Sequence, residues 1–449
     1  MSNPEFAIFL YNNLTPYLVI FPFVILVYLV SLRKYFNSII DPFFLCIVTS
    51  ALAFIPVLYL KYFNLIKDNI FYYCIFAELS FWLGFVISYK KSEFAPNNTT
   101  NIPDKLYFNL FLFFAAIVVF FQLLIYAMFG IPLFSKNRLE TFSSGGGFAM
   151  VSKIVGILKF FCVIYSFYIY KTRSFIAILF ILFYVVTLFL GGSKSFILGL
   201  FTAYFVYLNF YKEQKVYLPK YLYLLVFLTP FLVLLVKPES DMDAAIEALL
   251  FRIAAYGDIY WYSFPEDDIQ HILIKSPLLN LFSQVLGPLR LIDYKEHGVA
   301  LGTLLFWRVD GDSVFGITGG PNARPVVLGY AYFRYWGVVF CYICGSFMAI
   351  FMSHLKKYFS KNILTISLIG YIYINSTTIA IDPVLSLMFI IPLTLCVFFT
   401  KYIMYLLSCG SVKMTCRELS CDFKNKCSVQ THALNFAVIS IISIVLFFI

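Results

Sequence analysis

Apolar stretches close to 20 residues long alternate with short polar segments along most of the chain. A helix needs about 20 apolar residues to cross the hydrocarbon core of a bilayer. The pattern therefore predicts an all-α polytopic membrane protein, a single integral membrane domain over residues 1–449 with about twelve transmembrane helices. The predicted spans are residues 10–31, 40–60, 70–89, 106–128, 152–170, 174–190, 195–211, 219–236, 326–352, 362–380, 383–406 and 433–449.

One long polar segment, residues 238–325, interrupts this alternation. We call it the long loop. It carries twelve of the 23 acidic residues of the chain but only six basic ones, a formal charge of −6. We expect this loop to be partly helical and to hold most of the chemistry of the protein.

The basic residues of the short loops indicate how the chain is oriented. They gather after odd-numbered spans, and the positive-inside rule places such loops in the cytoplasm. Residues 129–151, the turn 191–194 and the long loop are then predicted to face outward. The basic loops hold Arg33, Lys34, Lys90, Lys91, Lys171, Arg173, Lys212, Lys215, Lys220, Lys356, Lys357 and Lys361, followed by a basic tail from Lys401 to Lys426.

Composition narrows the setting further. Abundant Phe, Tyr, Ile, Lys and Asn are typical of an AT-rich bacterial genome, so we expect a multi-pass protein of the bacterial inner (cytoplasmic) membrane with its active face in the periplasm. The net charge of +10 is explained by the cytoplasmic loops and does not indicate nucleic-acid binding.

The ten cysteines do not form a standard metal pattern. Cys341 and Cys344 have C-x-x-C spacing but lie inside an apolar span, where a metal or redox site would lack polar support. Four more cluster with irregular spacing in the tail, near His432. Free thiols are the preferred interpretation, and a metal clip in the tail is the alternative. The tail cysteines are Cys409, Cys416, Cys421 and Cys427.

Two short outward segments carry cations. In the first, Gly130 and Pro132 break the helix, and Arg138 follows at headgroup level; it is either an interfacial anchor or a ligand-binding residue. The second is the tight turn before Lys194, which is suited to snorkelling or to pairing with an anion. Its Gly-Ser-Lys string lacks the full nucleotide-binding motif, so we reject a P-loop.

The long loop begins with a predicted amphipathic helix that carries Arg252, lies along the outer membrane surface and continues to Tyr260-Trp261-Tyr262. These three aromatic rings offer faces to sugars or form an interfacial belt. The loop then ends in a run rich in turn formers that includes Arg308, Asn322 and Arg324. In the span that follows, Arg334 is predicted to line a cavity, because charge inside a membrane is usually functional.

Several arginines at one membrane face suit a lipid-borne, multiply charged phosphate, because guanidinium groups bind phosphate oxygens bidentately. Carboxylates and histidines of the same loop could take a proton from a hydroxyl group. The general base stays open among Asp258, His271 and His297. A lipid-pyrophosphate donor and a sugar acceptor would use all of these features.

Four short motifs of the chain resemble those of a known protein family. With them, the layout of nearly the whole chain resembles the bacterial O-antigen and related oligosaccharide repeat-unit polymerases, the Wzy type. The motifs are Gly130-Ile-Pro-Leu-Phe134 with Arg138 and Gly145-Gly-Gly147, then Gly191-Gly-Ser-Lys194, then Leu250-Phe-Arg252-Ile253, and lastly Gly319, Pro321-Asn322, Gly329-Tyr330 and Gly337.

The resemblance implies a fold like the C type of glycosyltransferases, and an activity without cofactor or metal. Such an enzyme would transfer the growing glycan from undecaprenyl pyrophosphate to the nonreducing-end hydroxyl of a lipid-linked repeat unit. Arg138 and Arg252 would engage the pyrophosphates, with Arg308 and Arg324 next. Lys194 stands where related proteins often have arginine.

The family also implies partners, and it leaves two alternatives. Expected partners are undecaprenyl-pyrophosphate-linked oligosaccharides, membrane lipids, and a chain-length regulator and flippase of the same pathway. One alternative is an O-antigen ligase, which would use the same kind of donor. The other is a lipid-linked oligosaccharide flippase or transporter, which predicts charge in many spans and short loops at both faces.

Overall fold

A computed structural model describes residues 1–95, 104–134, 147–191, 196–214, 242–272, 274, 276–287, 291–293, 297–311, 319–359, 361–395 and 398. Two predicted spans, residues 219–236 and 433–449, lie outside the described residues. So do Arg138, Lys194 and the cysteines of the tail.

Within this part, seven helical segments are long and apolar enough to cross a membrane. Shorter apolar helices cover Ser174–Leu190 and Pro383–Leu395. These segments confirm an all-α protein of the multi-pass membrane type, while the count of twelve spans and the glycosyltransferase fold stay predictions. The seven segments are Leu14–Tyr35, Pro42–Tyr62, Asp68–Ser88, Tyr107–Phe134, Val151–Ile169, Pro325–Tyr358 and Ile363–Ala380.

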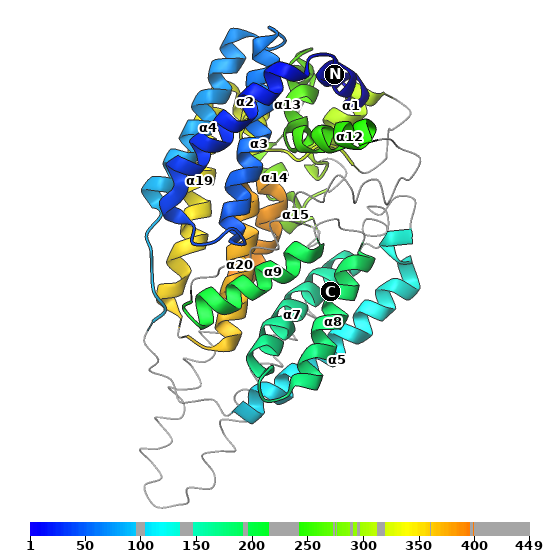
Figure 1. Cartoon of the computed structure of the whole chain (residues 1–449), viewed down its shortest axis with the longest axis vertical. Coiled ribbons are helices and arrows are strands. Elements are labelled where there is room, and N and C mark those ends of the chain that lie inside the picture. The colour runs from blue at the N-terminus through cyan, green and yellow to red at the C-terminus, as the bar shows by residue number, and fades with distance from the viewer. Residues whose placement is uncertain are drawn as a thin grey trace, which may run out of the picture.

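The helices of the membrane part form two groups (Figure 1). The first contains α2, α3, α4, α19 and α20, and the second contains α5, α7 and α8. Helix α9 contacts α7, α8 and α20 and so joins the groups. Their bounds are α2 Leu14–Leu32, α3 Pro42–Tyr62, α4 Asp68–Ser88, α5 Asp104–Phe129, α7 Gly147–Ile169, α8 Ser174–Leu190, α9 Phe196–Val206, α19 Gly337–Ser353 and α20 Ile363–Thr377.

Short helices of the long loop cover one end of this bundle, together with the N-terminal helix α1 (Figure 1). We call this end the loop end. The elements concerned are α1 (Asn3–Asn12), α12 (Met242–Ala254), η4 (Ala255–Gly257), α13 (Asp258–Ser263), η5 (Asp268–His271) and α17 (Leu301–Asp310). Helices α14 (Pro277–Leu281) and α15 (Ser283–Leu286) lie nearer the middle of the molecule in this view.

The predicted cytoplasmic loops meet at the opposite end, which we call the basic end. The backbone N–H of Lys90 donates to the hydroxyl of Ser353, beside η8 (His354–Tyr358). The ammonium of Lys361 pairs with Glu213, after the π-helical turn η3 (Tyr207–Tyr211). The grouping of these loops therefore agrees with the sequence pattern, and which end faces the cytoplasm stays a prediction.

Helices α4 and α19 pack at close range because glycines lie in their interface. A side chain on Gly84 or on Gly345 would collide with backbone atoms of the other helix. Small residues allow such approach between membrane helices, where van der Waals packing replaces the hydrophobic driving force. This pair fixes the frame on which the next segment folds.

The predicted single span 326–352 is a helical hairpin instead. Helix α18 (Pro325–Phe333) ends at Arg334, whose φ of 53° reverses the chain, and α19 then runs back. A Cβ on Gly329 would lie 3.0 Å from the carbonyl oxygen of Gly337. In one straight helix these residues would be about 12 Å apart. The candidate span Pro325–Tyr358 contains the predicted one, but the reversal was not predicted, because apolarity alone does not reveal a turn between two apolar helices.

Candidate functional site

The end of the long loop enters the bundle as an extended segment, residues 319–324. Gly302 of α17 and Gly320, whose φ is +110°, let this segment lie against α17 without room for a side chain between them. The hydroxyl of Thr303 donates to the carbonyl oxygen of Gly319 at 2.7 Å. The segment is therefore held in place before it reaches Arg324.

Arg324 is the buried cation of this site, with 4% of its side chain exposed. Its Nε donates to the carbonyl oxygen of Tyr256 at 3.1 Å, Nη1 to that of Ala380 at 3.3 Å, and Nη2 to that of Thr49 at 3.0 Å. These carbonyl groups belong to η4, to η9 (Thr378–Ala380) and to α3. A buried charge must be hydrogen-bonded to be tolerated, so Arg324 ties three distant parts of the chain together.

Asp258 begins α13, two residues after the carbonyl group that Arg324 holds. Gly257 packs so tightly on Ala53 of α3 that a Cβ there would collide with its backbone, and this contact lodges the half-buried Asp258 against the bundle. Burial raises the pKa of the Asp258 carboxyl to about 7, although the nearby charge of Arg324 lowers it. A carboxyl that titrates near neutral pH is suited to act as a general base.

Asp382 follows Arg324 in the sequence. It lies between η9 and the helix Pro383–Leu395. Its carboxylate accepts the N–H of Ala323 at 3.4 Å and that of Leu385 at 3.1 Å. It thereby caps one helix and holds the residue just before Arg324.

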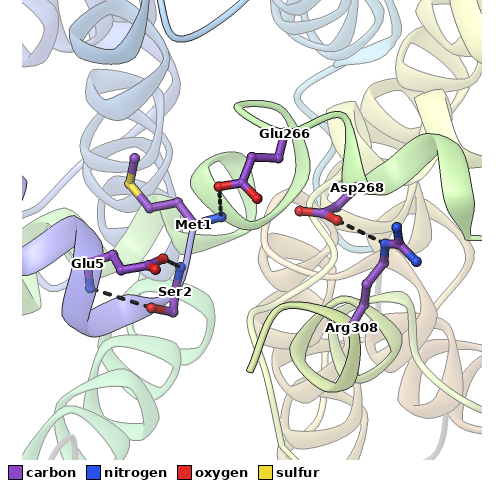
Figure 2. Close-up of polar contacts among 6 residues, drawn as sticks. All are labelled: Met1, Ser2, Glu5, Glu266, Asp268 and Arg308. Carbon is purple, nitrogen blue, oxygen red and sulfur yellow. Dashed lines mark hydrogen bonds and ion pairs between the residues drawn. The ribbon is translucent and has the colours of Figure 1, made fainter. Parts of the chain in front are cut away.

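Ion pairs close the surface of the loop end. Figure 2 shows the amino group of Met1 with Glu266, at 3.7 Å, and Arg308 of α17 with Asp268, at 2.9 Å between Nε and Oδ1. The third acid of this run, Asp267, pairs with Lys67 between α3 and α4. The predicted site residue Arg308 therefore lies at the surface and shares its charge with a carboxylate.

Arg252 differs from Arg308 and Arg324. It is exposed near the end of α12, and within the described part of the chain its guanidinium makes no ion pair. Nor is α12 a helix that lies free on a membrane surface, because it contacts α1 and α3. The contacts of α12 fix the backbone at Arg252, and the guanidinium group is exposed.

Tyr260 lies in the core, with 1% of its side chain exposed. Trp261 is fully buried and stacks on Phe6 at 3.8 Å between ring centroids, and Tyr262 donates its hydroxyl to Asp310 at 2.8 Å. Both interpretations of these aromatic residues required an accessible face, and burial contradicts both. The reason is tertiary: α1 and α17 cover rings that the local sequence suggests are exposed.

The remaining predicted site residues are scattered. Asn322 is exposed, on the extended segment. Arg334 is exposed at the hairpin turn, 5.4 Å from the centroid of the Tyr330 ring, and its predicted place at a cavity stays a prediction. His297 is half-buried beside α14, where its carbonyl oxygen accepts from Asn280, while His271 is exposed in η5. Of the predicted residues that the structure describes, it brings together Asp258 and Arg324.

The sequence reasoning missed three charged side chains. Asp382 holds the segment before Arg324, and Glu78 of α4 accepts from the hydroxyl of Tyr28 and the indole N–H of Trp82, at 2.6 and 2.8 Å. Lys159 of α7 donates to Gln122 of α5 and Thr187 of α8, both neutral, within the described residues. A charge inside or beside an apolar run was the available signal for all three.

Among the described residues, no group of three or more His, Cys, Asp and Glu could hold a metal ion. Cys341 and Cys344 are buried free thiols in α19. In comparisons with known proteins, no family model, curated protein or solved structure matches the chain.

Proposed function

We propose that the protein is an oligosaccharide repeat-unit polymerase of the Wzy type, a metal-independent glycosyltransferase of the bacterial inner membrane. It would transfer a growing glycan from undecaprenyl pyrophosphate to the nonreducing-end hydroxyl of a lipid-linked repeat unit at the periplasmic face. The observation that carries the proposal is the Asp258 carboxyl, titrating near pH 7 on the polar loop beside the buried charge of Arg324.

In the proposed reaction, Asp258 takes the proton from the acceptor hydroxyl group. The hydroxyl oxygen then bonds to C1 of the donor sugar as the bond from C1 to the pyrophosphate oxygen breaks. Negative charge grows on the leaving undecaprenyl pyrophosphate, and the guanidinium of Arg252, exposed and without an ion pair among the described residues, is suited to bind it.

Arg324 has a different role in this scheme from the phosphate contact that the sequence suggested. Its guanidinium is bound by carbonyl oxygens, one of them two residues before Asp258. We therefore assign it as a positioning residue that fixes the turn at Gly257. The Nε of Arg308 is bound to Asp268, so its charge is shared with a carboxylate.

Deletion of the gene and complementation by the full chain test the proposal. Loss of long glycan chains, with lipid carrying a single repeat retained, supports a polymerase. Polymer that accumulates on its lipid carrier without transfer would indicate a ligase instead. Loss of the single-repeat product as well would indicate a block before polymerisation and would refute the proposal.

One observation favours a transporter or flippase as the second candidate. Helix α18 and the helix Pro383–Leu395 begin at neighbouring points inside the bundle, joined through Asp382 and Ala323. Interrupted helices that start inside the membrane are typical of transporter sites. Transport of the lipid-linked repeat unit in vesicles that contain only this protein would favour this candidate.

A further inference from the structure

The turn of the hairpin between α18 and α19 exposes four consecutive residues, 333–336, which we call the tip. Three of them are aromatic, and the fourth is Arg334. All four tryptophans of the chain lie among the described residues, and Trp336 is the exposed one: 78% of its side chain is accessible, whereas Trp82 and Trp261 are buried. An exposed indole ring at a turn between two apolar helices indicates a partner outside the chain.

The tip is fixed by its packing. Arg334 adopts a left-handed φ of 53°, which is uncommon for a residue that carries a Cβ. Gly337 lies so close to Gly329 that a Cβ there would collide with backbone atoms of Gly329. The hydroxyl oxygen of Tyr335 accepts from Nδ2 of Asn69 at 2.6 Å. The fold therefore presents the tip in one position, at the start of α19.

The bond between Asn69 and Tyr335 also gives the depth of the tip in the membrane. Asn69 is the second residue of α4, a candidate span of 21 residues, about 30 Å long and so equal to the hydrocarbon core. Helix α19 runs beside α4 in the same direction, since further along Ser346 donates to the carbonyl oxygen of Gly84. Lys67, just before α4, is exposed. The tip therefore lies where the span ends and water begins.

The face on which Trp336 lies follows from α19. Trp336 has helical dihedral angles and directly precedes this helix. Exposed apolar residues then recur every three or four positions, so they share one face of the helix. The opposite face carries Gly345, which packs against the backbone of α4. In a membrane protein an exposed apolar face contacts acyl chains, and Trp336 stands at its water-side end. The residues of this face are Val339, Ile343, Phe347 and Ile350.

Arg334 adds a cation to the tip. It is exposed, and within the described residues its guanidinium makes no ion pair and lies over the ring of Tyr330. A ring attracts a cation without cancelling its charge. The N–H groups of Arg334 are therefore available to phosphate oxygens at the same level.

We propose that the tip is an anchor in the headgroup layer of the bilayer, with the indole ring of Trp336 among the phospholipid headgroups of the loop end. Tryptophan is enriched at this level because its ring is apolar while its N–H is polar. The anchor would hold the α18–α19 hairpin at a fixed depth. It does not depend on the proposed glycan transfer, because its position is measured without substrate.

Fluorescence quenching in vesicles provides the test. The full chain is reconstituted into phosphatidylcholine whose acyl chains carry bromine either near the ester group or near the terminal methyl group. The emission that is lost on Trp336→Phe belongs to Trp336. Bromine near the ester group should reduce this emission at least about twofold, because the ring lies at headgroup level, and bromine near the methyl group should reduce it less. Trp336→Phe should keep the thermal midpoint within about 2 °C of wild type, since the ring is exposed.

Trp82→Phe is the matched control. Trp82 lies in the neighbouring helix α4, but it is buried and donates its indole N–H to Glu78. The emission lost on Trp82→Phe should be quenched much less than that of Trp336 by bromine near the ester group.

Three results would overturn the proposal. Emission of Trp336 that responds to acrylamide but to neither brominated lipid would place the tip in water. Protection from acrylamide and from both lipids would show that protein, such as a second copy of the chain, covers the tip. Stronger quenching by bromine near the methyl group than near the ester group would place the ring in the hydrocarbon core.

Discussion

The two ends of the bundle hold their cations in different ways. At the loop end, four cations of the described residues pair with carboxylates, in Met1–Glu266, Lys61–Asp68, Lys67–Asp267 and Arg308–Asp268, and Arg334 lies over the Tyr330 ring. At the basic end, Lys361 pairs with Glu213, but more of the described cations lie over aromatic rings. These pairs are Arg33–Phe36, Lys34–Tyr35, Arg173–Phe108, Lys212–Tyr211, Lys356–Phe210 and Lys357–Tyr358.

The difference concerns net charge. A ring attracts a cation without cancelling its charge, so the basic end keeps a positive field that suits anionic headgroups. A carboxylate cancels the charge, so most cations of the loop end stabilise the fold and leave no net positive charge. Arg252 and Arg334, both exposed and without an ion pair in the described chain, are the exceptions there. The comparison therefore singles out Arg252 and the buried pair Asp258 and Arg324 from the many charges of the long loop.

The largest effect is expected at Asp258. Asp258→Asn keeps the shape of the side chain but removes the proton acceptor, so polymerisation should fall about 10²- to 10⁴-fold at normal protein levels. Incorporation of labelled repeat units into polymer measures this. Glu247→Gln, an exposed acid of α12, should leave the rate unchanged. Near wild-type activity in Asp258→Asn would leave the histidines as the base candidates.

Arg252→Ala is the next largest, with an expected loss of about 10²- to 10³-fold if the guanidinium stabilises the leaving pyrophosphate. Arg252→Lys should retain little activity, because an ammonium cannot bind bidentately. The matched control is Arg33→Ala, which removes an exposed arginine of the basic end. Long glycan chains made in normal amounts by Arg252→Ala would remove this residue from the site.

Arg324→Met tests the positioning role through stability. The change removes hydrogen bonds from a charged group to three carbonyl oxygens, and such bonds contribute about 1.5–3 kcal/mol each. We expect the thermal midpoint of the detergent-solubilised protein to fall by at least about 5 °C. Arg308→Met, at the surface, should lower it by less than about 2 °C. Equal effects of the two would show that burial of Arg324 does not matter.

The pH profile provides a test that needs no variant. A base acts only when it is deprotonated, and the folded-state pKa of Asp258 is raised to about 7. The rate at limiting acceptor should therefore rise about tenfold per pH unit below pH 7 and level off above it. A profile that is flat from pH 5.5 to 8 would exclude a base with this pKa.

The sequence predicted the elements well and their contacts poorly. The spans 40–60, 70–89, 106–128 and 174–190 agree with α3, α4, α5 and α8 to within a few residues, since hydropathy and helix length are local properties. Arg324 and Asp258 were named, but nothing local indicates that carbonyl groups of α3, η4 and η9 converge on Arg324. Trp261 was misjudged for the same reason, because its stacking partner Phe6 lies in α1, some 250 residues away in the chain.

The smallest effect is expected where the loop end is closed by surface ion pairs. Asp268→Asn removes the pair with Arg308, and an exposed pair contributes about 0.2–1 kcal/mol. Stability should change little. The guanidinium of Arg308, freed from its carboxylate partner, then resembles the exposed guanidinium of Arg252. If loop-end cations recruit the lipid pyrophosphate, the apparent KM for the donor should fall in Asp268→Asn. It should return to the wild-type value in the double variant that carries both Asp268→Asn and Arg308→Met. A donor KM that does not respond to either change would show that Arg308 serves folding alone.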